Sequence, residues 1–465
     1  MHSPNDFMYK EFLEHKKIFN MSNKWDYMML SSGTNQFPMP KLWKELIVEE
    51  INNDYTYQLY VSPYGFETAN RSINLYENFL STKGDFSNEI VNENSVCMAI
   101  GSSQAASLVM DYLAAKNPNY KIIIVGKNYA LYEMLSKKCK LEIAQVTSHD
   151  KFIPDINEIL MYIENCSDNH AFIFSHPNNP SGEQYSQEEY DKILSSLKKK
   201  HCFAIFDEVC NMIISNNDLV IIESSITKLN YWNNCVIINS FSKTESIPGF
   251  RLGYVYASKE IINYIFQQQS CSLMSIPSVL VLPVFFTSLF RCMFLSEKYS
   301  WNRYDKKRLI QIFRSIFYIT TSIPDDCIKS IIEDKFNNID LIYNTYIQEL
   351  LDNENTINEN YKYLLEKLDK YIIGVSSLKS GFNFMIKLKF IEKFTELEFV
   401  SDLLKKTGLA VLTESAFSLE SNMDSMFWFR ISLACPSKIF KKAINKLLDY
   451  ILVLEQEYYF DEQKI

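Results

Sequence analysis

The chain has 465 residues, of which 47% are hydrophobic and 22% charged, so its composition is that of a folded globular protein and not of a disordered one. Its length predicts two or three domains. The formal net charge of −9 argues against a surface that binds nucleic acid and against a polybasic membrane anchor.

The N-terminal segment MHSPNDFMYKEFLEHKK is polar and charged, so it lacks the apolar core of a secretory signal. The ten cysteines are scattered, without a CxxC pair or the spacing of a metal finger. We therefore expect a cytoplasmic protein with free thiols, no metal site and no membrane association.

Short apolar runs rich in β-branched residues alternate with helix-like segments between about residues 96 and 257. This pattern predicts an α/β fold with a mostly parallel, doubly wound sheet that is covered on both faces. The predicted strands are 96–100, 121–125, 141–146, 171–175, 203–207, 235–239 and 252–257, and helices are predicted at 104–115 and 187–199. Ligands of such sheets bind at the carboxyl ends of the strands, so functional residues are expected directly after these runs.

Residues 261–290 contain no charged side chain, but glutamines and prolines interrupt the apolar runs. A buried helix or a segment at a subunit interface is therefore expected there, and not a membrane span. A smaller α+β domain is predicted to follow, with strands at 382–388 and 427–433 and a final helix at 437–455. The predicted division is an N-terminal arm with part of the small domain (1–60), a large domain (61–295), a helical insertion (296–335) and the C-terminal small domain (336–465).

Two of the predicted strands end in loops that suit ligand binding. The turn Gly101-Ser102-Ser103-Gln104-Ala105 opens a helix, whose free N–H groups and positive dipole end favour a phosphate, although an ordinary helix cap explains the turn as well. The loop at 176–182 holds Asn179 between two prolines and before a glycine, which positions its amide toward the crevice or simply makes a turn.

Charged residues follow two further strands. Asp207 ends an apolar strand, where a carboxylate needs either a structural salt bridge or a bound cation such as a protonated heterocyclic nitrogen. Lys243 follows the strand at 235–239 and is a candidate for a covalent bond to a carbonyl compound, although most lysines of this chain are surface residues. Arg251 lies eight residues later, between two of the only 11 glycines of the chain, and can donate two hydrogen bonds to a phosphate.

Taken together, these motifs resemble those of the class I and II aminotransferases, which are fold-type-I enzymes that use pyridoxal 5'-phosphate (PLP). The matching motifs are Asn-Pro-x-Gly at 179–182, Asp-Glu at 207–208, Ser-x-Ser-Lys at 240–243 and Gly-x-Arg at 249–251. Further matches are Gly33 before Phe37-Pro38, Tyr60 before Gly65, the turn at 101–105, and Phe-Trp-Phe-Arg at 427–430. The resemblance covers roughly residues 27–290 and 360–450.

The resemblance implies which residues perform the chemistry and bind the cofactor ring. Lys243 would bind PLP covalently and transfer protons, and Asp207 would pair with the pyridinium nitrogen so that the ring remains an electron sink. Asn179 would bind the phenolic oxygen of the ring, and Tyr129 would stack on its face. An ordinary core or surface aromatic is the alternative for Tyr129.

The resemblance also implies how the phosphate and the substrate are held. The phosphate would be bound by Ser103, Gln104, Ser240, Ser242 and Arg251, and by Tyr60 from across the interface of a homodimer with shared active sites. An ordinary surface aromatic is the alternative for Tyr60. Arg430 would bind the substrate α-carboxylate, with Gly33 and Asn179 beside it.

Two positions depart from the family pattern. Cys210 stands where the family usually has a tyrosine that also bonds the ring oxygen of the cofactor. A thiol is a weak donor, so Asn179 is expected to be the main partner of that oxygen. The segment Thr413–Phe417 lacks the glycine and proline usual in the family.

The reaction implied is transfer of an amino group from an L-amino acid to a 2-oxo acid, as in amino acid metabolism and biosynthesis. Alternatives on the same fold are a β- or γ-eliminating lyase, a cyclising synthase, a decarboxylase, an oxidase and a non-catalytic PLP-binding module. A PLP-free interaction protein would leave Lys243, Asp207 and Arg251 unexplained together. The sequence shows no second arginine that can be assigned to the substrate, which argues against dicarboxylic substrates.

Overall fold

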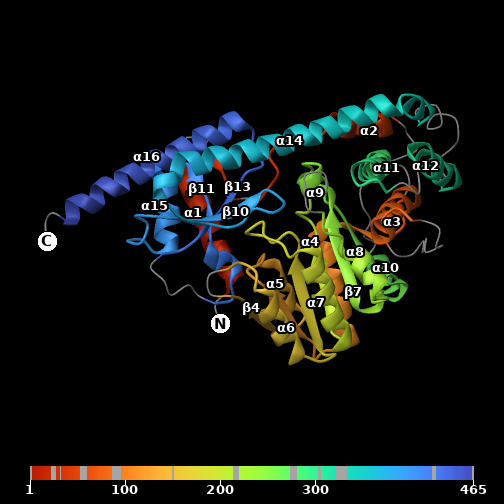
Figure 1. The fold of residues 1–465 in the computed structure, drawn as a ribbon, viewed down its shortest axis with the longest axis horizontal. Coiled ribbons are helices and arrows are strands. Elements are labelled where there is room, and N and C mark those ends of the chain that lie inside the picture. Colours follow the sequence, from red (N-terminus) through yellow and green to blue (C-terminus); the bar gives the residue numbers. More distant parts are fainter. Residues whose placement is uncertain are drawn as a thin grey trace.

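The computed structural model describes residues 3–21, 28–31, 33–52, 60–85, 96–148, 151–212, 219–272, 280–301, 305–320, 332–420 and 426–462. Figure 1 shows a larger domain built on a central sheet and a smaller domain beside it. The long helix α14 (Ile339–Leu368) runs along both domains.

Seven strands form the sheet of the larger domain, in the order β2-β8-β7-β6-β5-β3-β4. They are β2 (Val96–Ile100), β3 (Lys121–Val125), β4 (Glu142–Val146), β5 (His170–Ser175), β6 (Phe203–Asp207), β7 (Cys235–Ser240) and β8 (Leu252–Ala257). Strand β8 runs antiparallel to both of its neighbours, and the other strand pairs are parallel. The predicted mostly parallel sheet is therefore confirmed.

Helices cover both faces of this sheet, and the residues of β3 show why its inner strands contain continuous apolar runs. Ile123 and Val125 pack into the core on one face, whereas Ile122 and Ile124 pack into the core on the other. Alternate side chains of a strand point to opposite faces, so a strand covered on both sides must be apolar at every position. The first face is covered by α3 (Glu67–Thr82), α6 (Ile156–Glu164), α7 (Gln187–Lys199), α8 (Ile222–Lys228) and α11 (Val281–Lys298), and the second by α4 (Gly101–Lys116), α5 (Leu131–Lys138) and α10 (Lys259–Cys271).

The register of the sheet brings the ends of its central strands together. Asp207 at the end of β6 lies opposite Ser175, the last residue of β5, and opposite Ile238 near the end of β7. The loops that follow these strands therefore open on the same edge of the sheet.

The uncharged stretch at 261–290 is divided between α10 and α11 where the structure describes it. Every residue of α11 from 281 to 296 is buried, so this helix lies inside the larger domain. Within the described ranges, no helix has the length and apolar character needed to cross a membrane. The stretch therefore needs no subunit interface to bury α11.

The predicted insertion at 296–335 is helical where the structure describes it, in α12 (Lys306–Thr320). Phe313 and Phe317 lie four residues apart on one face of α12 and pack against Phe285 of α11, with ring centroids 5.7 and 5.6 Å away. The segment thus adds a helical layer to the core of the larger domain.

The smaller domain contains an antiparallel sheet in the order β12-β13-β10-β9 and a short parallel pair of β1 with β11. These strands are β1 (Met28–Met29), β9 (Ile372–Val375), β10 (Asn383–Leu388), β11 (Leu409–Ala410), β12 (Leu412–Thr413) and β13 (Phe429–Ser432), with helices α15 (Glu396–Thr407) and α16 (Ser437–Glu462). The strands predicted at 382–388 and 427–433 and the final helix are confirmed.

The two domains share elements near the predicted boundaries. The first half of α14 packs into the core of the larger domain and its second half into that of the smaller one. Among the first 60 residues, β1 joins the smaller domain, whereas α2 (Lys41–Ile51) packs into the larger one. Helix α1 (Pro4–Met21) contacts both α15 and α5.

Candidate active site

A cavity of about 220 Å³ lies where the carboxyl ends of β5, β6 and β7 meet the smaller domain. Its walls come from segments far apart in the chain: α1, the loop after β1, the start of α4, the residues at the start of α5, the ends of β5 and β6, the loops after β5, β6 and β7, β12, β13 and the turn at Phe417. Nine of the residues predicted to form the site line it: Gly33, Ser103, Tyr129, Asn179, Asp207, Ser242, Lys243, Arg251 and Arg430.

Three predicted residues do not line this cavity. Gln104 uses its side-chain oxygen to accept a hydrogen bond from the Ile100 N–H at 2.5 Å, so it stabilises its own turn. The Ser240 hydroxyl is occupied by Ser242 Oγ at 2.7 Å and by the Leu252 carbonyl at 2.9 Å. Tyr60 is fully exposed in the single chain.

Lys243 lies in the one-turn helix α9 (Phe241–Thr244), directly after β7. Ser240 begins this turn by accepting a hydrogen bond from the Ser242 N–H at 3.0 Å, and the Lys243 carbonyl accepts one from Asn35 Nδ2 at 2.8 Å. Burial lowers the pKa of the Lys243 amine, because the charged form is poorly solvated there. This lysine is therefore held in place and biased toward the neutral, nucleophilic form.

Asp207 ends β6 with its carboxylate at the cavity. Its Oδ1 accepts a hydrogen bond from the Val209 N–H at 3.2 Å and its Oδ2 one from the Tyr132 hydroxyl at 2.8 Å. Burial raises the pKa of the Asp207 carboxyl, and the Tyr132 hydroxyl acts in the opposite direction. Both of these donors are neutral, so the site offers a carboxylate that a bound cation would stabilise.

Tyr132 is a site residue that sequence reasoning missed. It is fully buried on α5, three residues after Tyr129. Tyr129 lies before the start of α5 and Tyr132 lies on it, so no helical spacing linked the two in the sequence, and nothing in the pattern marked Tyr132. Its contact with Asp207 joins residues 75 positions apart, so the pairing depends on the sheet and not on local sequence.

The turn at the start of α4 lies against Arg251. Gly101 has a φ of +73°, and a Cβ atom added to it would lie 2.7 Å from Arg251 Nη2. A Cβ on Gly253 would lie 2.6 Å from the backbone N of Ser102. Arg251 itself is held by a hydrogen bond from its Nη1 to the Pro248 carbonyl at 3.3 Å. The two glycines therefore allow a helix N-terminus and a guanidinium to approach closely, which suits a phosphate.

Arg430 extends from β13 of the smaller domain into the same cavity, where it is 4% exposed. Its Nη1 donates to Asn179 Oδ1 at 2.8 Å, its Nη2 donates to the Ser31 carbonyl, and its guanidinium lies 4.9 Å from the centre of the Phe417 ring. Burial lowers the pKa of this guanidinium. Among the described residues no carboxylate pairs with it, so a bound carboxylate would be its natural partner.

Gly33 makes room for this arginine. Its φ is +54°, and a Cβ atom there would lie 3.0 Å from Arg430 Nη2. Any side chain at position 33 would therefore press on the guanidinium and strain the backbone.

Tyr129 and Cys210 complete the wall near Asp207 and Lys243. Tyr129 is 38% exposed, so it lies toward the opening of the cavity. Burial raises the pKa of the Cys210 thiol to about 11, so the thiol is neutral at physiological pH. The residue that departs from the family pattern thus borders the cavity.

Comparison with known proteins agrees with this geometry. A sequence-family model described as aminotransferase class I and II matches residues 26–286, which is more than half of the chain. A probable N-acetyl-LL-diaminopimelate aminotransferase of Bacillus subtilis is 25% identical over 52% of this chain and 57% of its own length. A histidinol-phosphate aminotransferase of Flavobacterium psychrophilum is 28% identical over 38% of this chain and 47% of its own length. The chain thus spans only about half the length of these curated relatives.

Solved structures resemble the chain over nearly its whole length. An aminotransferase from Mycobacterium tuberculosis superposes with a TM-score of 0.69 at 17% identity, over 96% of both chains. The aspartate aminotransferase of Thermotoga maritima superposes with a TM-score of 0.65 at 18% identity, over 95% of both chains. These similarities establish the fold, including the part of the chain after residue 286 that the family model does not match.

Proposed function

Since the chain belongs to the class I and II aminotransferase family, we propose that it is a PLP-dependent aminotransferase that moves an amino group from an L-amino acid to a 2-oxo acid. The observation that carries this proposal is the meeting of Lys243, Asp207, Arg251 and Arg430 in one cavity, although they come from both domains. The names of the relatives, which include aspartate and histidinol-phosphate aminotransferases, support the reaction class.

The residues of the cavity fit PLP. Asp207 is a half-buried carboxylate whose two hydrogen-bond donors are neutral, which suits the pyridinium nitrogen. The backbone turn at Gly101 lies directly against the Arg251 guanidinium, with no room for a Cβ between them. The N–H groups of this turn, the guanidinium, Ser103 and Ser242 together suit the phosphate. Lys243 would bind the aldehyde carbon, and Asn179 and Tyr129 would contact the ring. When bound, PLP supplies an electron-withdrawing ring that stabilises negative charge at the substrate Cα.

The residues of the chain would then perform three tasks. Arg430 binds the substrate α-carboxylate through its two Nη atoms and is oriented by Asn179. Once the substrate amino group has displaced it from the cofactor, the Lys243 amine, whose pKa burial lowers, would accept the proton from the substrate Cα and hold it for return. Tyr132 holds the Asp207 carboxylate in place.

The substrates, the assembly and the location belong to the same proposal. The enzyme would act in the cytoplasm, within amino acid biosynthesis, as a homodimer in which Tyr60 reaches the phosphate of the partner's site. The complete exposure of Tyr60 in the single chain supports this, because a tyrosine on a surface that pairs with another subunit would be covered by it.

An isotope-transfer experiment tests the reaction. The purified enzyme is supplied with PLP, an amino acid labelled at its amino nitrogen and an unlabelled 2-oxo acid, and the products are identified by mass spectrometry. We expect the label in the new amino acid and its loss with Lys243→Ala. Label released as ammonia would indicate a lyase or an oxidase, and release of carbon dioxide would indicate a decarboxylase. Either result would contradict the proposal.

A further inference from the structure

Helix α1 contributes to the cavity although it precedes the part of the chain that the family model matches. Two of its side chains, Met8 and Phe12, line the cavity together with Leu412 and Phe417 of the smaller domain. Residues four apart lie on the same face of a helix, so Met8 and Phe12 form one apolar surface.

The helix is fixed in this position by contacts with both domains. Met8 belongs to a small buried cluster with Ala130, Leu412, Ala416 and Phe417. Glu11, which is buried, accepts hydrogen bonds from the Thr413 N–H at 3.2 Å and the Thr413 hydroxyl at 2.8 Å. On the other side the Asn5 N–H donates to Glu133 of α5 at 2.9 Å. The apolar surface is therefore a built wall of the cavity.

In the proposed complex, each cation of the described cavity lining already has a partner other than the substrate side chain. Among the described lining residues the cations are Lys243, Arg251 and Arg430. Lys243 and Arg251 suit the cofactor, and Arg430 suits the α-carboxylate of the substrate. The side chain of a bound amino acid would then face Met8, Phe12, Leu412 and Phe417, where a second carboxylate would find no further cation among the described lining residues and would lose its hydration.

We propose that α1 determines the substrate class, and that the enzyme prefers amino acids with uncharged apolar side chains over dicarboxylic ones. This inference rests on the proposed function. Met8 and Phe12 are the specificity residues, and they form one apolar wall with Leu412 and Phe417 of the smaller domain.

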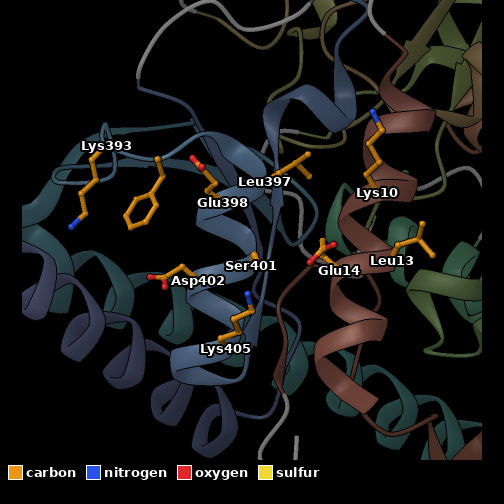
Figure 2. A pocket seen from close by; sticks show the side chains of 10 residues that line it. Lys10, Leu13, Glu14, Lys393, Leu397, Glu398, Ser401, Asp402 and Lys405 are labelled. Atoms are coloured by element: carbon orange, nitrogen blue, oxygen red, sulfur yellow. The ribbon is translucent and has the colours of Figure 1, made fainter. Parts of the chain in front are cut away.

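The opposite face of α1 provides a matched control. Figure 2 shows Lys10, Leu13 and Glu14 of α1 across an open groove of about 750 Å³ from residues of the α15 region. Leu13 is 44% exposed and Phe12 is 43% exposed, but only Phe12 lines the cavity. Truncating either side chain removes a similar apolar surface from the same helix.

The first test compares kcat/KM for L-phenylalanine, L-leucine and L-glutamate in the native enzyme, Phe12→Ala and Leu13→Ala. We expect both apolar donors to exceed glutamate by at least about tenfold, since an unpaired charge is costly in an apolar pocket. Phe12→Ala should lower the value for phenylalanine by about tenfold, and Leu13→Ala should change it by less than about twofold. Met8→Lys should raise the value for glutamate. A native preference for glutamate, as a cation from a partner subunit would produce, overturns the inference.

The second test does not depend on turnover. Titration calorimetry measures binding of the unreactive acids 3-phenylpropanoate and glutarate to the same three proteins. We expect 3-phenylpropanoate to bind more tightly, and this preference to weaken in Phe12→Ala but not in Leu13→Ala. Equal binding of both acids, or equal effects of both substitutions, overturns the inference. Absence of label transfer with this binding preference intact would contradict the proposed function alone.

Discussion

The pair of Asp207 and Tyr132 shows how one hydrogen bond can tune the proposed site. The Tyr132 hydroxyl donates to the carboxylate at 2.8 Å and opposes the rise in the Asp207 pKa that burial causes. A tyrosine that never reaches the substrate thereby helps to keep Asp207 ionised. We regard Tyr132 as a positioning residue.

Tyr132→Phe should raise the pKa of Asp207, because the donor that stabilises its charged form is lost. The acidic limb of the kcat profile should move to higher pH, and kcat should fall by about tenfold, the effect of one hydrogen bond to a charged group. PLP content should stay near that of the native protein. Tyr185→Phe is the control, because it removes a buried hydrogen bond to the Pro154 carbonyl outside the cavity. An acidic limb that does not move in Tyr132→Phe would contradict the positioning role.

Cys210 permits a second test at the scale of one residue. The neutral thiol is a weak donor, so a phenol in its place should stabilise negative charge on the ring oxygen of bound PLP. We expect Cys210→Tyr to lower the pH at which the absorbance of the bound cofactor titrates by about one unit, the value of a typical hydrogen bond. Cys210→Ser is the smaller control. A folded tyrosine variant that holds PLP and titrates like the native enzyme would show that this residue does not face the ring oxygen.

Among the elements, α2 and α11 illustrate how a buried carboxyl joins two helices. Glu50 of α2 accepts hydrogen bonds from the Val281 N–H at 3.3 Å and from the Leu282 N–H, at the start of α11. It thereby satisfies N–H groups that the helix cannot pair itself. Burial raises the pKa of Glu50 to about 8, so the group is protonated in the folded protein at neutral pH.

This shift predicts how stability depends on pH. Between about pH 4.5 and 8 the unfolded chain loses the Glu50 proton while the folded chain keeps it, so its contribution is fully present below that range and is lost as the pH rises. Glu50→Gln keeps an acceptor but cannot ionise. The free energy of unfolding is measured with urea for both proteins. The value for Glu50→Gln minus the value for the native protein should therefore increase from pH 5 to pH 8, by on the order of 4 kcal/mol. Glu45→Gln, on the exposed side of α2, is the control. A difference between Glu50→Gln and the native protein that does not change with pH would contradict this assignment.

At the scale of the whole molecule, the cavity exists only because two domains meet. Arg430 of β13 bonds to Asn179 of the larger domain, 251 residues away in sequence. Helix α14 packs into both cores and α1 contacts both domains. These two helices therefore fix the positions of the two domains, and with them the cavity walls, relative to each other. The proposed dimer would add Tyr60 as a third contribution.

Mixed dimers test whether the active sites are shared. Lys243→Ala and Tyr60→Ala should each be nearly inactive alone. Refolded together, a hybrid dimer would combine the Lys243 of one subunit with the Tyr60 of the other, so about a quarter of the native activity should return if subunits pair at random. Light scattering should show a dimer throughout. A mixture that is no more active than its parents would contradict sharing of the sites.

The sequence alone determined the strands and which residues stand at their ends. In β6 the four residues before Asp207 are all apolar because both faces of the sheet are covered, so the strand can be recognised from neighbouring residues alone. Lys243 and Asp207 follow from the same rule, since parallel strands deliver their last residues to one edge. The turn at a helix N-terminus marked Gly101 and the family resemblance marked Gly33, and at both positions a Cβ would meet a guanidinium.

Only the tertiary structure decided which side chains meet. It paired Tyr132 with Asp207 and Asn179 with Arg430. It also bonded the Ser240 hydroxyl to the Leu252 carbonyl and the Gln104 side chain to the Ile100 N–H, and packed α1 against the cavity. The physical reason is that secondary structure follows from the order of neighbouring residues, whereas these contacts depend on packing between elements far apart in the chain. Periodicity says which face of α1 is apolar, but only its docking between two domains says what that face covers.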